Sequence, residues 1–537
     1  MFGLGHWAHI NLAFNRIWDG DWTKGPAGGY GTNEVTWGEF STNVPDLHVG
    51  HLAESWRFEV DNARQQATTI VKMRSGIHFQ TPNTEAGRLV AGRELTVDDA
   101  VFCENEFLHN PASFNLMLFP YIKDFQAVKG PGPDEFSITL PFYDHLGGIM
   151  RLFDNMVLYP PELQKKYGPG TGSQGFNDWR YLVGTGPFMV RDYVAGSMSL
   201  VVRNPNYWMT DPIGPGKGNQ LPYLDEVRTY VIPDESTRLA ALRTGRLDQL
   251  LNVNLEAKDE LLKSAPGIKF AVAGWSGTGS IGFNANQLKA FGDVNVRRAM
   301  QMSIDYQSIN KSMYGGLADV VTWPYNYQKA YADLYVGLDA PDCPDSVKEL
   351  WSYNVDKAKQ LLKDAGYPNG FKFELTSLQT ESDYFSIIKD YFSKINVDMT
   401  LKLIEVGVQP SVLTSQAYQA ASLRVSPPST YPEQAQFTGT SYINHSLIKD
   451  PMADKVAQET RVQAITDFHG AMKATRELTK HLLDQAYVVP SPYYPVYCMY
   501  WPWVKNYDGE QTVGYFSGSF WTQYVWLDQS LKKSMGH

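Results

Sequence analysis

Residues 273–285 read AGWSGTGSIGFNA, and Gly277, Gly279 and Gly282 have the spacing of a loop that holds a dinucleotide pyrophosphate. The loop follows a predicted strand, as such a site requires. However, a dinucleotide site also needs a helix that opens at the last glycine and an acidic residue about 20 residues later. The residues after Gly282 read FNANQLKAFGDV, a polar stretch interrupted by glycine. The sequence therefore disfavours nucleotide binding, and we expect these glycines to allow close backbone approach and bending.

Neither a nucleophile elbow nor a phosphate loop is present as a motif. Ser276 follows a glycine by two positions, but Thr278 stands where the elbow needs its second glycine. Residues 211–218, DPIGPGKG, lack the four-residue spacer and the hydroxyl residue after the lysine. With no acid, base or nucleophile motif to assign, we predict that the chain is not an enzyme.

Two histidine pairs, His6 with His9 and His48 with His51, have a three-residue spacing that could present two imidazoles to a metal from one helix face. Neither pair has the HExxH pattern or a nearby cysteine. Structural roles or hydrogen bonding to a ligand are therefore favoured, and we predict no metal and no cofactor.

The composition excludes several classes of partner. The formal net charge is −10 and no stripe of Lys or Arg occurs, so nucleic acid is disfavoured. No apolar run approaches the roughly 18 residues of a membrane helix, so we expect no direct membrane insertion. Cys103, Cys343 and Cys498 allow one disulfide at most, and buried free thiols are favoured.

The elements that must position any site follow an α/β pattern. Between residues 50 and 145 short alternating runs predict strands, with an inserted helix near 96–108 that begins at the N-cap Thr96. A helix followed by a strand is predicted in residues 233–253, again in 354–378 and again in 381–406. A chain of 537 residues needs two or three cores. We therefore expect helices that cover sheets in at least two lobes, with an early β-rich insertion.

Seven longer stretches, in this order, resemble one family of binding proteins. They are LAESW (52–56), IVKMRSGIHF (70–79), LTVDDAVF (95–102), VGTGPFMVRDYVAGSMSLVVRNPNYW (183–208), LPYLDEVRTYVIPDESTRLAALRTGRLDQL (221–250), VRRAMQMSIDYQSINKSMYGG (296–316) and NVDKAKQLLKDAGYPNGFKFELT (354–376). The chain resembles the extracellular solute-binding proteins of the peptide/nickel type, family 5, which serve bacterial ABC importers. The resemblance implies a two-lobed periplasmic-binding-protein clamshell of the large cluster C type, with an extra β-rich subdomain in lobe I.

By this resemblance, lobe I comprises residues 1–272 and 485–537, with the β-rich subdomain at about 40–182, and lobe II comprises residues 273–484. The chain is expected to cross between the lobes near Trp275 and again near residues 488–497. The family's usual first strand, with a GGTL-like start, is not found, and we expect that it is trimmed or replaced by another segment and not lost.

The resemblance also implies a function. We expect a periplasmic or extracellular receptor, with a cell-surface lipoprotein as one alternative, that captures a peptide-like or oligosaccharide-like small solute by hinge closure. Its partner would be the membrane permease of an ABC importer, and the receptor would be a monomer. Two alternatives remain open, namely a hydrolase that processes a cleft-bound glycan or peptide, and a sensor coupled to a chemoreceptor.

The resemblance places candidate ligand residues in lobe II. In peptide binders a carboxylate that follows a strand takes the α-ammonium of the ligand, and the matching stretch here, residues 423–434, has Thr430 at that place. A buried ammonium without an anion costs several kcal/mol, so a neutral solute is favoured over a free peptide N-terminus. Arg424 matches an arginine of oligopeptide binders, and either pairs with a ligand carboxylate or braces the lobe.

Aromatic and histidine side chains complete the prediction. Flat indole and phenol faces suit ring-containing solutes, although each of these rings could equally pack in a core. The predicted ligand-binding residues other than Arg424 and Thr430 are His6, Trp7, His9, Trp275, Trp323, Tyr325 and Tyr384.

Overall fold

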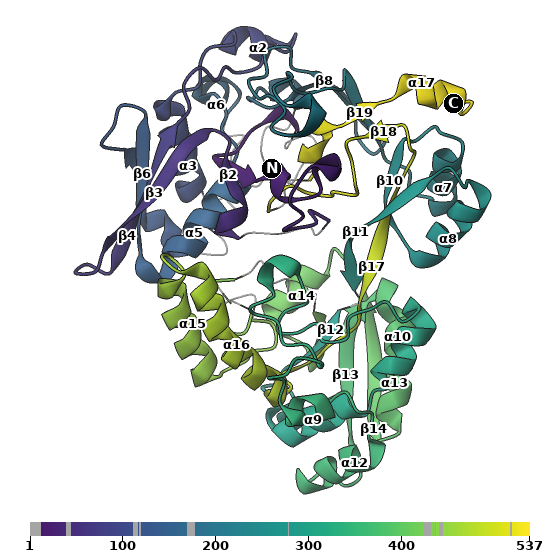
Figure 1. Cartoon of the computed structure of the whole chain (residues 1–537). Helices are drawn as coiled ribbons and strands as arrows, with labels where there is room; N and C mark the ends of the chain where they lie inside the picture. The colour runs from purple at the N-terminus through teal and green to yellow at the C-terminus, as the bar shows by residue number, and fades with distance from the viewer. Residues whose placement is uncertain are drawn as a thin grey trace. The chain divides into compact units, whose positions relative to one another are not determined.

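The structure is a computed structural model that describes residues 12–38, 44–110, 116, 120–168, 178–277, 279–423, 431–432, 434, 436–439, 444–515 and 518–537. The chain divides into two compact units. Unit 1 comprises Met1–Gly274 and Val496–His537, and unit 2 comprises Trp275–Pro495. Both contain helices and sheets, as expected of an α/β protein (Figure 1).

Unit 1 is rich in short strands. The strands that lie wholly within it are β1 (Trp18–Gly20), β2 (His48–Gly50), β3 (Ala53–Asp61), β4 (Gln66–Met73), β5 (Ala127–Lys129), β6 (Glu135–Pro141), β7 (Phe188–Val194), β8 (Met198–Arg203), β9 (Glu226–Tyr230), β10 (Gln249–Val253), β18 (Val504–Lys505) and β19 (Trp526–Leu527). Its α-helices are α2 (Glu85–Val90), α3 (Val97–His109), α5 (Phe142–Asn155), α6 (Pro161–Tyr167), α7 (Glu235–Arg243), α8 (Leu255–Ser264) and α17 (Gln529–Ser534).

An antiparallel sheet in the order β3-β4-β6-β5 forms part of unit 1, and α3 packs against β5 and β6. Alternate residues of β6, from Phe136 to Leu140, are buried, which is the pattern of a sheet with one covered face. The predicted helix near 96–108 is confirmed as α3. Thr96 caps it, with its side chain accepting from the backbone N–H of Asp99.

All three cysteines are free and buried, as the sequence favoured. Cys103 lies in α3, and burial raises the pKa of its thiol. Burial likewise raises the pKa of Cys498 to about 12. A thiol that stays protonated is a poor nucleophile, so these two cysteines are structural.

Unit 2 is built on a sheet in the order β14-β13-β15-β12-β16. These strands are β12 (Ser280–Phe283), β13 (Phe371–Leu378), β14 (Val397–Ile404), β15 (Ala420–Leu423) and β16 (Val488–Val489). Its α-helices are α9 (Val294–Met302), α10 (Tyr306–Tyr314), α11 (Asp345–Glu349), α12 (Val355–Asp364), α13 (Ser382–Ser393), α14 (Gln409–Ser415), α15 (Pro451–Gln463) and α16 (Phe468–Gln485). The predicted helix-then-strand units are confirmed as α12 with β13 and α13 with β14. Among the helices of the described residues, none has the length and apolar character to span a membrane.

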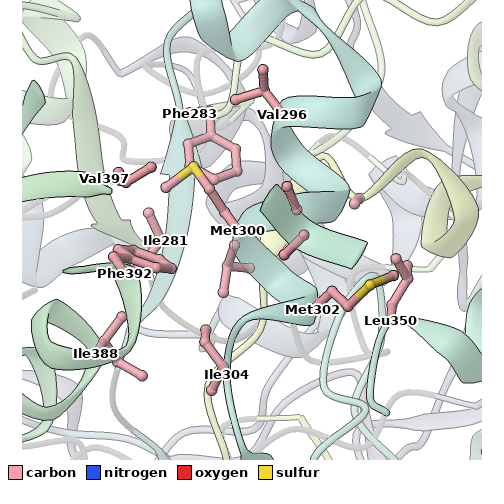
Figure 2. Packing of buried hydrophobic residues seen from close by; sticks show 14 of the residues in the cluster. Ile281, Phe283, Val296, Met300, Met302, Ile304, Leu350, Ile388, Phe392 and Val397 are labelled. Atoms are coloured by element: carbon pink, nitrogen blue, oxygen red, sulfur yellow. The ribbon is translucent and has the colours of Figure 1, made fainter. Parts of the chain in front are cut away.

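The core of unit 2 lies between its sheet and its helices, where α9 supplies Val296 and Met300, β12 supplies Ile281 and Phe283, and α13 adds further apolar side chains such as Phe392 (Figure 2). All five are at most 3% exposed. This packing fixes the register of β12 between β15 and β16, because a one-residue shift would turn Ile281 and Phe283 to the other face of the sheet.

Two strands contain the points where the chain passes from one unit to the other. They are β11 (Lys269–Gly277) and β17 (Tyr493–Tyr500), which are neighbours in the sheet β10-β17-β11. The second passage follows Pro495. Local pairing holds the residues before it in unit 2, since Val489 pairs with Ile281 of β12 and Tyr493 pairs with Asp319.

Candidate functional site

We identify a candidate site at one edge of the unit 2 sheet, where the parallel strands β13, β14, β15 and β16 end and the antiparallel β12 begins. We call it the carboxyl edge of unit 2. In α/β sheets ligands bind outside the carboxyl ends of the strands, at the point where neighbouring connections run in opposite directions. Here β13 leads to β14 on one side, and the chain then returns past β13 to β15 on the other.

The carboxylate of Glu381 lies at this edge and ties three segments together. Its Oε1 accepts the backbone N–H of Gly279 at 2.7 Å. Its Oε2 accepts the hydroxyls of Ser422 at 2.5 Å and Ser377 at 2.8 Å, and the backbone N–H of Leu378 at 3.2 Å. Two hydroxyls and two backbone amides thus donate to one carboxylate.

A second chain of hydrogen bonds extends the edge to the segment 322–328, TWPYNYQ. The backbone N–H of Ser491 donates to Ser280 Oγ at 3.2 Å. Thr322 Oγ1 donates to the carbonyl of Ser491 at 2.7 Å. These contacts hold the segment beside the start of β12, and they bring Trp323 and Tyr325 to the same part of unit 2.

Trp323 and Tyr325 form an aromatic cluster with Phe437 and Tyr487. The ring of Trp323 lies 6.5 Å from each of the Phe437 and Tyr487 rings, edge to face, and Tyr325 lies 5.9 Å from Phe437. Trp323 is 6% and Tyr325 2% exposed. Burial raises the pKa of Tyr325 well above its ordinary value, and within the described part of the chain its hydroxyl has no hydrogen-bond partner.

Three amide oxygens of unit 2, which we call the unpaired amide oxygens, are buried without a hydrogen-bond partner in the described part of the chain. They are Asn326 Oδ1, Gln328 Oε1 and Gln434 Oε1. Buried polar atoms are nearly always paired, so each of these acceptors is a candidate for a hydrogen bond to a bound group. A group that donates hydrogen bonds would satisfy them. These residues were not predicted from the sequence, although Asn326 directly follows the predicted Tyr325.

The structure describes two of the other predicted ligand residues, Tyr384 and Trp275, and leaves five outside the described residues. Tyr384 lies in α13, 5% exposed and within the apolar core of unit 2, three residues after Glu381. Trp275 lies in β11, where the structure describes the backbone only. Outside the described residues lie His6, Trp7, His9, Arg424 and Thr430. The structure therefore brings Trp323 and Tyr325 together, and the ligand role of all nine residues stays a prediction.

The histidine pair at 48 and 51 is buried in unit 1 and does not lie on a helix. His48 begins β2 and stacks on Trp18 with ring centroids 4.8 Å apart, and His51 stacks on Phe520 at 4.7 Å. Burial lowers the pKa of each imidazole to about 3. Across the described ranges, no group of three or more His, Cys, Asp or Glu side chains is placed to hold a metal ion.

Comparisons with known proteins agree with this fold. The model of the family "Bacterial extracellular solute-binding proteins, family 5 Middle" matches residues 48–443. A heme-binding protein A of Haemophilus influenzae is 27% identical over 352 residues, which cover 62% of this chain and 56% of that protein. The glutathione-binding protein GsiB of Escherichia coli is 27% identical over 379 residues, which cover 69% of this chain and 62% of that protein. These matches thus span less than two thirds of either relative.

A solved structure shows the same fold along nearly the whole chain. The periplasmic binding protein DppA of Helicobacter pylori, in complex with the peptide STSA, superposes with a TM-score of 0.69 at 20% identity. The superposition covers 97% of this chain and 93% of that one, so the two-lobed binding-protein fold expected from the sequence is confirmed. The chain belongs to the family 5 bacterial extracellular solute-binding proteins.

Proposed function

We propose that this protein is the solute-binding receptor of an ABC importer, without catalytic activity of its own. The observation that carries the proposal is the family match over residues 48–443, which runs through both units. The receptor binds one small solute and presents it to the membrane permease, as a monomer in the periplasm or outside the cell.

The mechanism we propose is a population shift between open and closed forms. Two chain passages, in β11 and β17, join the units, and a hinge in these strands needs to change only a few backbone angles. A solute that contacts both lobes stabilises the closed form by its difference in affinity for the two forms.

The proposed solute is peptide-like or oligosaccharide-like and rich in hydrogen-bond donors. The relatives' names include heme, glutathione and peptide, so the family site admits varied chemistry. In this chain the unpaired amide oxygens call for donors, and the rings of Trp323 and Tyr325 favour a solute with a flat face. Thr430, in place of an acidic residue, favours a neutral group at the position where peptide binders hold an ammonium.

Native mass spectrometry of the purified protein tests this proposal directly. We expect one co-purified small molecule per chain. After its removal, calorimetric titration with glutathione, a free tetrapeptide, heme and a neutral tetrasaccharide should give one binder with 1:1 stoichiometry that is recovered unchanged. Conversion of any of these compounds by the protein would favour the hydrolase alternative. The absence of both a co-purified solute and measurable binding would overturn the proposal.

Two matched variants test the aromatic cluster. Tyr325→Phe removes only the buried, unpaired hydroxyl, whereas Tyr230→Phe makes the same change on a side chain of unit 1 that is 45% exposed. If Tyr325 contacts the solute through its hydroxyl, its variant should bind the same solute about tenfold more weakly. Equal affinity in the two variants would remove this hydroxyl from the site.

A further inference from the structure

The turn that enters unit 2 packs unusually tightly against β15. A Cβ atom added to Gly279 would lie 1.9 Å from Ser422 Oγ and 2.9 Å from the carbonyl oxygen of Leu423. One added to Gly282 would lie 2.1 Å from Leu423 Cδ1. At Gly279 the space is closed partly by backbone, since the Leu423 carbonyl cannot move aside without disturbing β15, so glycine is needed there because the backbones approach closely. At Gly282 the atoms in the way belong to the side chains of Leu423 and Ser446.

Glu381, the residue directly before α13, also contacts this turn. The same added Cβ on Gly279 would lie 3.0 Å from Glu381 Oε1, the atom that accepts the Gly279 N–H. The groups that donate to the carboxylate come from the turn before β12, from the end of β13 and from β15. Gly279 lies 102 residues before Glu381 and Ser422 lies 41 residues after it. The carboxylate therefore joins segments that are distant in sequence.

A carboxylate suits this position better than an amide would. Two oxygens here receive four donors, two from amides and two from hydroxyls. A glutamine has one acceptor oxygen, and its NH₂ group would face either the N–H of Gly279 or the donated hydroxyls of Ser377 and Ser422. Hydrogen bonds to an ionised acceptor are also roughly twice as strong as neutral ones.

We propose that Glu381 is a positioning residue of the carboxyl edge. Its carboxylate holds the turn after Trp275 against β15. The inference rests on the proposed function only in that this edge binds the solute. Glu381 acts through the backbone of Gly279 and the hydroxyl of Ser422, and it fixes the turn before β12 relative to β15.

Hydrogen exchange without any solute tests the positioning directly. In Glu381→Gln we expect amide exchange in residues 277–283 and 420–423 to accelerate about tenfold, because a charge-assisted hydrogen bond is lost. Elsewhere in unit 2 exchange should stay as in the wild type. The matched control is Glu374→Gln, on β13, whose carboxylate makes an ion pair with Lys402 at 3.6 Å. Unchanged exchange at 277–283, or equal acceleration throughout unit 2, would overturn the proposal.

The Gly279 amide resonance and solute affinity distinguish positioning from stability alone. In protein labelled with ¹⁵N-glycine, the Gly279 proton should move upfield in Glu381→Gln and stay in place in Glu374→Gln. For the solute identified by native mass spectrometry, affinity should fall about tenfold at a temperature where both variants are fully folded. A lower melting temperature with unchanged affinity and resonance would contradict positioning. If no solute binds the wild type, the proposed function fails, while exchange and the resonance still decide the role of Glu381.

Discussion

Glu104 of α3 is an isolated acid in the interior of unit 1. It is 0% exposed, and neither carboxyl oxygen has a hydrogen-bond partner among the described residues. Burial alone raises its pKa well above the ordinary value. Between the unfolded pKa of about 4.3 and this raised value, the folded chain keeps a proton that the unfolded chain has lost. The free energy of unfolding therefore falls as pH rises, by up to about 1.4 kcal/mol per pH unit.

Glu104→Gln should remove this pH dependence. We expect urea unfolding of the variant to give a flatter profile between pH 5 and pH 8, with higher stability than the wild type at pH 8. Glu106→Gln, on the same helix but partly exposed and bonded to Gln164, should keep the wild-type slope. Parallel profiles for the Glu104→Gln variant and the wild type would mean that Glu104 finds a partner when it ionises.

At the residue scale, the sequence predicted features that depend only on residues close together in the chain. Close backbone approach is found at Gly279, one of the glycines for which the sequence predicted it, because glycine spacing is readable in one short stretch. Glu381 was not predicted. Its role depends on Gly279 and Ser422, which lie far from it in sequence, and such pairing cannot be found from spacing alone.

At the scale of elements, helix starts were predictable because caps are local. Thr96→Ala should lower the free energy of unfolding by about 1 kcal/mol, since the first turn of α3 loses the side chain that accepts the Asp99 N–H. Thr229→Ala, on an exposed position of β9, should change it by less than about 0.5 kcal/mol. Equal losses in chemical denaturation would show that the cap contributes nothing specific.

The helix-then-strand alternation of unit 2 was also predictable, because amphipathic helices and alternating strands have distinct periods. The two-residue strand β16 was not, since Val488 and Val489 carry no period of their own. Their assignment to unit 2 depends on pairing with β12, more than 200 residues earlier.

At the scale of the whole molecule, each unit has its own buried core, so we expect calorimetry to resolve two unfolding transitions. Met300→Ala, fully buried in unit 2, should lower one transition by several degrees, and Phe136→Ala, fully buried in unit 1, should lower the other. A single transition with equal calorimetric and van't Hoff enthalpies, shifted by both variants, would contradict independent cores.

Unit 2 is an inserted domain, since unit 1 comprises residues on both sides of it. The strands that carry its entry and its exit, β11 and β17, are neighbours in one sheet, and just inside the unit the N–H of Ser491 donates to Ser280 Oγ. Chains built this way tolerate excision and exchange of the insert. A short linker from β11 to β17 could close unit 1 without unit 2, and the corresponding unit of a relative could be grafted at the same two strands.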